Sequence, residues 1–159
     1  MSKSFVHLHA HTEYSMLDGA AKINDYLNKV KELNQPAAAI TDHGNLYGAL
    51  EFVRQAEILD IKPIIGYEAY VTPGSRFDRP ERDKNKRYHL TLLAENNIGY
   101  QNLVELVSKA YLEGFYYKPR VDYDLLQEHA EGIIALSGCL GGEVCLLYTS
   151  DAADDLRGG

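Results

Sequence analysis

The sequence predicts an α/β fold in which short strands alternate with helices around a largely parallel sheet. Two observations predict it: several segments carry apolar residues at helical spacing, and short apolar runs separate those segments. Helices that connect consecutive strands favour right-handed βαβ units, which build parallel sheets. A chain of 159 residues with a hydrophobic content of 45% and a charged content of 25% suits one globular domain with its own core.

The first half of the chain contains two predicted strand–helix pairs. Residues 5–11 are interpreted as a strand, and apolar positions from Ile23 to Leu33 recur at helical spacing until Pro36 ends the helix. A short apolar strand is predicted over residues 37–41. The apolar face of the helix after it consists of Leu46, Leu50, Val53 and Ala56. This order is typical of a βαβ unit.

The second half continues the alternation. Residues 62–71 are the third predicted strand, and residues 90–94 are the fourth. The next helix is marked by apolar residues at helical spacing, which are Leu103, Leu106, Val107 and Ala110. A short helix over residues 124–129 and a fifth strand over residues 133–136 complete the predicted elements.

Residues 73–87 break the alternation, because they show no apolar periodicity and contain two prolines. A connection without a crossover helix favours an antiparallel return of the chain. His89 then enters its strand beside the end of the strand that carries Glu68, whereas a parallel strand would place His89 at the opposite end. We therefore expect His89 and Glu68 to be neighbours.

The spacing of histidines is the strongest functional signal. His7, His9 and His11 alternate near the start of the chain, and His43 follows the second predicted strand. Residues two apart on a strand point to the same face, so we expect the three alternating histidines to project in one direction. A single histidine is more often a core or surface residue. Histidines at two neighbouring strand ends, however, predict a metal site, because imidazole is the commonest metal ligand.

Further candidate ligands fall at the same predicted edge of the sheet, where α/β proteins gather their sites. They are Asp18, Glu68, His89 and Cys139. Simpler interpretations exist for three of them: Asp18 as a turn residue, Glu68 as a solvated acid and Cys139 as a buried apolar residue. His7 is interpreted as a partner that orients a ligand. The mixture of imidazole, carboxylate and thiolate favours zinc, with manganese or iron as alternatives.

Charge and cysteine content limit the partners and the location. The net charge of −7 disfavours nucleic-acid binding over the whole surface, so any such contact must be local. Two cysteines are too few for a disulfide framework, and no apolar run is long enough for a membrane span. The N-terminal residues show no signal-peptide pattern. These observations predict a cytoplasmic protein with no membrane contact.

The segment from Arg76 to Arg87 is locally basic, with six basic residues against three acidic ones. The candidates for substrate binding in it are Arg82, Lys84, Lys86 and Arg87. Two interpretations stay open: a solvated loop, or a positive rim beside the predicted site that attracts a phosphodiester.

Several motifs together resemble the polymerase and histidinol phosphatase (PHP) family of metal-dependent phosphoesterases. These motifs are Leu8-His9-Ala10-His11-Thr12, Thr41-Asp42-His43-Gly44 and Gly66-Tyr67-Glu68-Ala69-Tyr70. Other segments resemble the PHP domains of bacterial DNA polymerase III alpha subunits, namely residues 14–19, 89–94, 99–103 and 136–140. The resemblance extends from about residue 4 to residue 144.

The resemblance implies a distorted seven-stranded β/α barrel, similar to a TIM barrel, that holds two to three zinc ions. The implied metal ligands are His9, His11, Asp18, His43, Glu68, His89 and Cys139, with Glu68 bridging two ions. The implied activity is metal-dependent phosphodiester hydrolysis, associated with 3′–5′ proofreading, in a domain of a replicative DNA polymerase. The implied partners are DNA, the remainder of the polymerase chain and other replisome subunits.

The resemblance is incomplete toward the C-terminus. The family's closing Asp-x-His motif and last strands are absent, so residues 1–144 are predicted to be an incomplete PHP domain that is inactive alone. Residues 145–159 lack the family pattern and are predicted to be an artefactual tail. Two alternatives stay open: a PHP domain that supports the polymerase without hydrolysing anything, and, less favoured, a free-standing PHP phosphatase.

Overall fold

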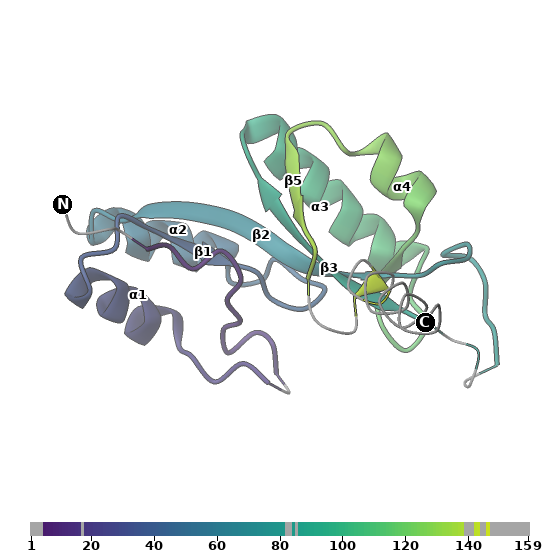
Figure 1. Ribbon diagram of the computed structural model, residues 1–159, viewed down its shortest axis with the longest axis horizontal. Helices are drawn as coiled ribbons and strands as arrows, with labels where there is room; N and C mark the ends of the chain where they lie inside the picture. The colour runs from purple at the N-terminus through teal and green to yellow at the C-terminus, as the bar shows by residue number, and fades with distance from the viewer. Residues whose placement is uncertain are drawn as a thin grey trace, which may run out of the picture.

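The computed structural model describes residues 5–16, 18–81, 84, 86–138, 142–143 and 146, and these residues form a mixed α/β fold (Figure 1). In chain order the elements are α1 (Ile23–Glu32), β1 (Ala37–Ile40), α2 (Ala49–Ile58), β2 (Lys62–Val71), β3 (Tyr88–Ala94), α3 (Asn97–Leu112), β4 (Arg120–Val121), α4 (Tyr123–Glu128) and β5 (Ile133–Leu136). None of the described helices has the length and apolarity that crossing a membrane requires.

The sheet is mixed, which corrects the expectation of a largely parallel one. β2 pairs in parallel with β1 and β4, whereas the pairs β2–β3 and β3–β5 are antiparallel. The helix-free connection between β2 and β3 accounts for the first antiparallel pair, as expected. The second antiparallel pair, β3–β5, arises because α3 connects β3 to β4 and α4 connects β4 to β5, so that β5 runs in the same direction as β4 and opposite to β3. β4 has only two residues, too few for a sequence pattern to reveal.

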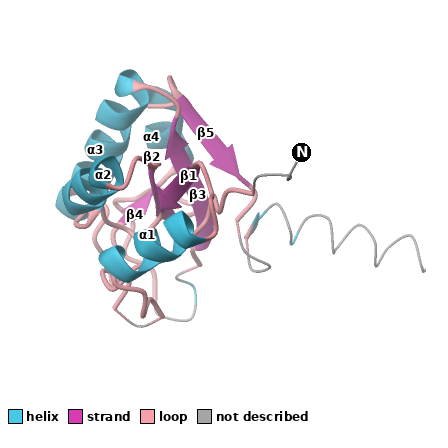
Figure 2. Cartoon of the chain, turned by 90° about the vertical axis from the view of Figure 1, so that its left-hand side faces the viewer, coloured by secondary structure: helices cyan, strands magenta, loops and turns pink. Residues whose placement is uncertain are grey.

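The five described strands form an open sheet in the order β1–β2–β3–β5, with β4 beside β2. Figure 2 shows α2 and α3 on the same side of the strands. β5 lies at the edge of the sheet that is farthest from β1. A closed barrel of seven strands stays a prediction, because the described residues contain five strands.

β2 is long enough to join two hydrophobic cores. The first core packs α1 and α2 against β1 through residues such as Leu27 and Phe52. The second packs α3 and α4 against β2 and β3, with Leu103 and Leu125 fully buried. Figure 1 shows these helix pairs around opposite ends of β2. The long strand therefore holds the two halves of the described fold together.

The alternation of side chains along β2 decides which residues face the candidate site. Tyr67, Ala69 and Val71 enter the second core. Because successive side chains on a strand point to opposite faces, Glu68 and Tyr70 point away from that core. Both are nevertheless buried. A buried carboxylate on this face needs polar partners, and it finds them in the surrounding histidines.

Residues 5–11 lie beside β1 but do not form the expected regular strand. The Ala39 amide donates to the His7 carbonyl at 3.2 Å, and the Thr41 amide donates to the Ala10 carbonyl at 2.9 Å. A step of two residues at the end of β1, from Ala39 to Thr41, thus corresponds to a step of three residues along the N-terminal segment, from His7 to Ala10. One extra residue interrupts the ladder, as in a β-bulge, and changes which histidines share a face.

The apolar face of α2 also differs from the expected one. Ala49, Phe52 and Ala56 are buried, whereas Leu50 is exposed. The Phe52 ring lies 6.2 Å from the Tyr26 ring of α1. The bulkier Phe52 side chain therefore lies between α1 and α2, and α2 is rotated about its axis so that Leu50 faces outward.

Candidate metal centre

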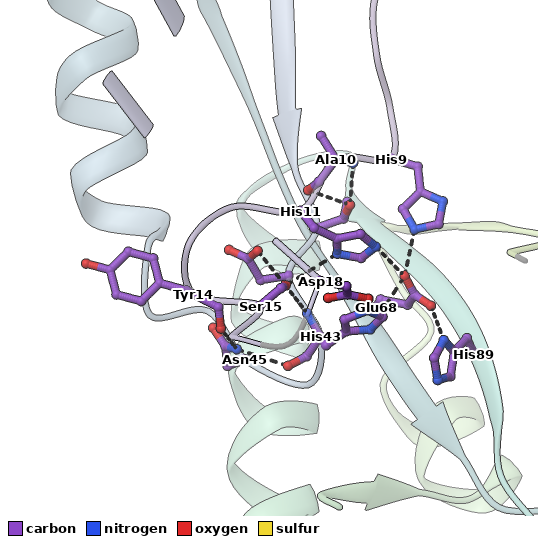
Figure 3. Close-up of polar contacts among 12 residues, drawn as sticks. His9, Ala10, His11, Tyr14, Ser15, Asp18, His43, Asn45, Glu68 and His89 are labelled. Atoms are coloured by element: carbon purple, nitrogen blue, oxygen red, sulfur yellow. Dashed lines mark hydrogen bonds and ion pairs between the residues drawn. The ribbon is translucent and has the colours of Figure 1, made fainter. Parts of the chain in front are cut away.

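The carboxylate of Glu68 lies at the centre of four histidine rings (Figure 3). Its Oε2 atom is 2.6 Å from His9 Nε2 and 3.0 Å from His11 Nε2. Its Oε1 atom contacts His89 Nδ1 on the neighbouring strand β3. The fourth ring is that of His43, whose Nδ1 is 3.7 Å from Oε2. With a side chain only 2% exposed, Glu68 has imidazoles in place of water as its neighbours.

Pairing along β2 positions two of these histidines. Tyr70 is opposite His89 in the antiparallel pair, and Glu68 is opposite Thr91, so His89 is the diagonal neighbour of Glu68. This confirms the expected proximity of the two residues. On the other edge of β2, His43 forms a parallel bridge with Glu68. The strand thus places one histidine on each side of the carboxylate.

A glycine allows the chain to pass closely after His43. Gly44 has a positive φ of 65°, and its amide donates to the Glu68 carbonyl at 2.9 Å. A Cβ atom at this position would lie 2.9 Å from the Pro119 side chain and 3.1 Å from the Tyr70 ring. Both the backbone conformation and the close packing therefore require glycine.

Ser15 connects the loop after the N-terminal histidines to His43. Its hydroxyl accepts a hydrogen bond from the His43 amide at 3.0 Å and donates to the Asp42 carboxylate at 2.7 Å. The same oxygen lies 3.4 Å from His11 Nδ1. Sequence reasoning missed Ser15, Asp42 and Thr12 as parts of the site. The sequence did offer a signal for two of them, because Thr12 directly follows His11 and Asp42 directly precedes His43 in the motifs quoted above.

The donor atoms have the spacing that a metal site needs. Those of His9, His11 and Glu68 lie within 4.8 Å of one another, and so do those of His43, Glu68 and His89. His43 Nδ1 is also buried without a hydrogen-bond partner among the described residues, whereas buried polar atoms normally have one. A cation between the rings would give this nitrogen a partner. The residues present therefore fit a bound metal.

Glu68 and the histidines change each other's protonation. Burial alone raises the pKa of a carboxyl group, but hydrogen bonds with His11, His89 and His9 outweigh this effect and hold the pKa of Glu68 well below its usual range. The hydrogen bond to Glu68 in turn raises the pKa of His11. Glu68 is therefore ionised at neutral pH, which is the form that binds a metal.

Two predicted ligands remain, Asp18 and Cys139, and of these Asp18 borders the cluster. Asp18 Oδ2 lies 2.8 Å from His43 Nε2, at the exposed edge of the group. Cys139 lies outside the described residues. Gly138, however, packs so tightly against the backbone of His89 that a Cβ there would lie 2.7 Å from the His89 carbonyl oxygen. The described chain thus approaches the cluster immediately before Cys139.

The expectation that His7 orients a ligand is wrong. Its exposed ring packs edge-on against Phe5, with 4.8 Å between the ring centres. Within the described ranges it makes no hydrogen bond to a candidate ligand. The extra residue in the ladder between His7 and Ala10 separates it from the two following histidines, and Ser15 is the residue that contacts His11 instead.

The basic segment is divided by the fold. Arg87 lines a cleft beside the histidine cluster. Lys84 pairs with Glu81 at 2.9 Å, and Lys86 shares a separate hollow with Lys84. Arg82 lies outside the described residues. Of the described basic candidates, Arg87 is the one placed beside the histidines.

Comparison with known sequences gives close relatives. The chain is 58% identical over 155 residues to the DNA polymerase III subunit alpha of Thermus aquaticus, and 54% identical over 163 residues to that of Deinococcus radiodurans. These alignments cover 94% and 98% of this chain, but 13% and 12% of the relatives. The chain therefore spans about an eighth of the length of the curated relatives it matches.

A solved structure shares the fold. A Bifidobacterium adolescentis protein named as a metal-dependent phosphoesterase superposes with a TM-score of 0.50 at 16% sequence identity, covering 69% of this chain and 34% of that one. In addition, the PHP domain family model matches residues 7–158, a range that contains Glu68 and the four histidines around it. The chain therefore belongs to the PHP domain family.

Proposed function

We propose that this chain is part of a bacterial DNA polymerase III alpha subunit and that its Glu68 cluster holds metal ions for phosphodiester hydrolysis. The observation that carries the proposal is the pair of three-residue ligand groups that share Glu68. The similarity to alpha subunits over nearly the whole chain supports the polymerase context. In that context the partners are DNA, the rest of the polymerase chain and the cytoplasmic replisome.

The ligand groups suggest how two or three ions are held. His9, His11 and Glu68 would hold one ion, and His43, His89 and Glu68 would hold a second. The family resemblance implies that Asp18 and Cys139 are further ligands of these ions. Imidazole, carboxylate and thiolate donors favour zinc, with manganese or iron as alternatives.

The chain's own residues prepare this site in three ways. The histidines keep Glu68 ionised, Ser15 fixes the position of His11 and His43, and Arg87 places a positive charge beside the cluster. Bound divalent ions supply the charge that stabilises a phosphoryl group and its leaving oxygen during hydrolysis. The proposed substrate is the 3′ end of a DNA strand, which makes the reaction a 3′–5′ exonuclease step.

The rival hypothesis is a PHP domain that supports the polymerase without hydrolysis. Such a scaffold needs no buried anion among four histidines, because burying a charge is costly unless it is paired. The five clustered residues all have metal-binding side chains. This arrangement favours hydrolysis over a purely structural role.

The test uses the full-length protein that carries this chain. In the variants His9→Ala and His89→Ala we expect less bound zinc by elemental analysis, and at least about 100-fold slower release of the 3′-terminal nucleotide from a single-stranded oligonucleotide. His7→Ala is the matched control, because His7 is two residues from His9 and lies outside the cluster. Unchanged metal content would contradict the ligand assignment. Lost metal with unchanged nucleotide release would favour the scaffold hypothesis.

A further inference from the structure

A cleft of about 470 Å³ opens beside the candidate metal centre. Part of its lining comes from the centre itself, through Asp18, His43 and His89. Much of the remaining lining is aromatic and consists of Tyr14, Tyr47, Tyr70, Tyr111, Phe115 and Tyr117. The volume lies within the range of roughly 300–1,000 Å³ that is typical of ligand pockets.

The outer aromatic residues of this cleft do not belong to a hydrophobic core. Tyr47 is 65% exposed, Phe115 is 51% exposed and Tyr117 is 59% exposed. Tyr47 precedes α2, whereas Phe115 and Tyr117 follow α3, and the Tyr111 ring of α3 stacks on Phe115 at 6.0 Å between centres. Exposed aromatic rings that converge from separate segments on one cleft indicate a binding surface.

The loop that carries two of these rings is held in an unfavourable backbone conformation. Tyr117 has a positive φ of 61°, which is rare for a bulky residue. The buried guanidinium of Arg120 anchors the loop by donating to the Gly114 carbonyl at 3.0 Å and to the Asp78 carbonyl at 2.7 Å. Backbone strain that the surrounding structure maintains is typical of ligand sites. The surrounding structure thus maintains the backbone conformation of Tyr117, which lines the cleft.

Two cations line the cleft along with the aromatic rings. They are Arg87 and Lys118, and Lys118 Nζ lies 5.3 Å from the centre of the Tyr70 ring. This positive charge is local, because the whole chain has a net charge of −7. Proteins bind single-stranded nucleic acids with these two components: cations contact the phosphates, and aromatic rings stack on the bases.

We propose that the cleft binds the unpaired end of a nucleic-acid strand, with bases stacked on Tyr47, Phe115 and Tyr117 and phosphates near Arg87 and Lys118. The inference rests on the proposed function, since it makes the cleft the approach to the Glu68 cluster. A base inside a duplex is already stacked between its neighbours, so a stacking site favours an end that has frayed or is mispaired. The cleft thereby selects unpaired ends.

Photo-crosslinking tests the position of the base without requiring hydrolysis. The probe is a single-stranded oligonucleotide with 5-iododeoxyuridine at its 3′ end and a phosphorothioate at its last linkage, mixed with the full-length protein. Irradiation joins the iodinated base to an aromatic ring that stacks on it, and mass spectrometry identifies the peptide. We expect crosslinks at Tyr47, Phe115 or Tyr117. Crosslinks found only outside the cleft would overturn the proposal.

Substitutions test affinity with matched controls. Tyr47→Ser and Phe115→Ser each raise the KM for a single-stranded oligonucleotide about tenfold and leave kcat unchanged. Tyr100→Ser, at an exposed tyrosine of α3 outside the cleft, leaves KM unchanged. Arg87→Gln weakens the salt dependence of KM, whereas Arg54→Gln on the exposed face of α2 does not. Tyr47→Ser and Phe115→Ser also lower the crosslink yield, whereas Tyr100→Ser leaves the yield unchanged.

The two proposals fail in different ways. If both proposals hold, His9→Ala slows nucleotide release at least about 100-fold but retains the crosslinks in the cleft. Crosslinks in the cleft without any hydrolysis by the unaltered protein support the nucleic-acid site and overturn the hydrolytic function. Normal crosslinking and KM in the aromatic variants, together with a lower Tm of the full-length protein, would show that the rings pack against protein, and would overturn the inference.

Discussion

Asp42 accepts two hydrogen bonds from Thr12, one from the backbone amide at 2.6 Å and one from the hydroxyl at 2.7 Å. Both residues are buried, and the Ser15 hydroxyl adds a third hydrogen bond to the same carboxylate. Asp42 therefore fastens the segment that carries the N-terminal histidines to the end of β1. It does so without being a candidate ligand itself.

Removing the Asp42 carboxylate should lower both the stability of the protein and its metal affinity, although Asp42 is not a candidate ligand. Asp42→Ala leaves three buried donors without an acceptor, so we expect the free energy of unfolding to fall by about 3 kcal/mol. Bound metal should also decrease although every ligand is present. Asp42→Asn retains an acceptor and should have a smaller effect. Urea unfolding and elemental analysis measure both quantities, and an alanine variant as stable as the unaltered protein would contradict the role of Asp42.

Gly44→Ala tests the turn after His43. An alanine there must adopt a positive φ and place its Cβ against Pro119 and Tyr70, so we expect a loss of about 1–3 kcal/mol in the free energy of unfolding. Gly74→Ala is the control, because its Cβ meets only the flexible end of the Asp78 side chain. We expect that control to change stability by less than about 0.5 kcal/mol. Equal losses in the two variants would refute the explanation.

Asp122 should contribute a pH-dependent part of the stability. It accepts hydrogen bonds from the Arg76 amide at 2.9 Å and from the Leu125 amide at 3.1 Å, where it caps α4. Burial raises its pKa, but these two hydrogen bonds and the Arg76 charge outweigh burial and lower it. Because the folded-state pKa lies below the unfolded value of about 3.9, the stabilisation is present above about pH 4 and is lost as the pH falls further.

The variant Asp122→Asn should therefore be less stable than the unaltered protein by about 1 kcal/mol at pH 7. The difference should shrink as the pH falls below about 4, where the aspartic acid becomes protonated. Chemical unfolding at a series of pH values measures this difference. Glu57→Gln, at an exposed acid of α2, is the control and should show no such trend. A difference that is constant with pH would contradict the assigned linkage.

The edge strand β5 should promote self-association of the isolated chain. Among the described strands β5 pairs with β3 alone, and Ile134 on it is 45% exposed. Unpaired strand edges with apolar side chains favour association, and a lysine opposes it. We expect Ile134→Lys to reduce light scattering by the 159-residue chain without lowering its Tm. Equal scattering by both proteins would show that the contact lies elsewhere.

Local sequence patterns determined much of the secondary structure and the chemistry of the site. β2 occupies the predicted residues 62–71, because its apolar run is bounded by clear breaks. The lack of a helix between β2 and β3 correctly predicted that His89 lies beside Glu68. The spacing of His9 and His11 indicated a ligand group, since histidines are seldom gathered for packing alone. These features depend on residues close together in the chain or on the length of one connection.

Only the tertiary structure decided how those elements meet. The extra residue between His7 and Ala10 removes one histidine from the cluster, and it is set by hydrogen bonds to β1 rather than by local propensity. Asp42 and Thr12 are thirty residues apart in sequence, and their contact leaves no periodic signal. The aromatic cleft likewise combines loops from separate parts of the chain. Contacts of this kind arise from packing between distant segments, so a pattern within any single segment cannot reveal them.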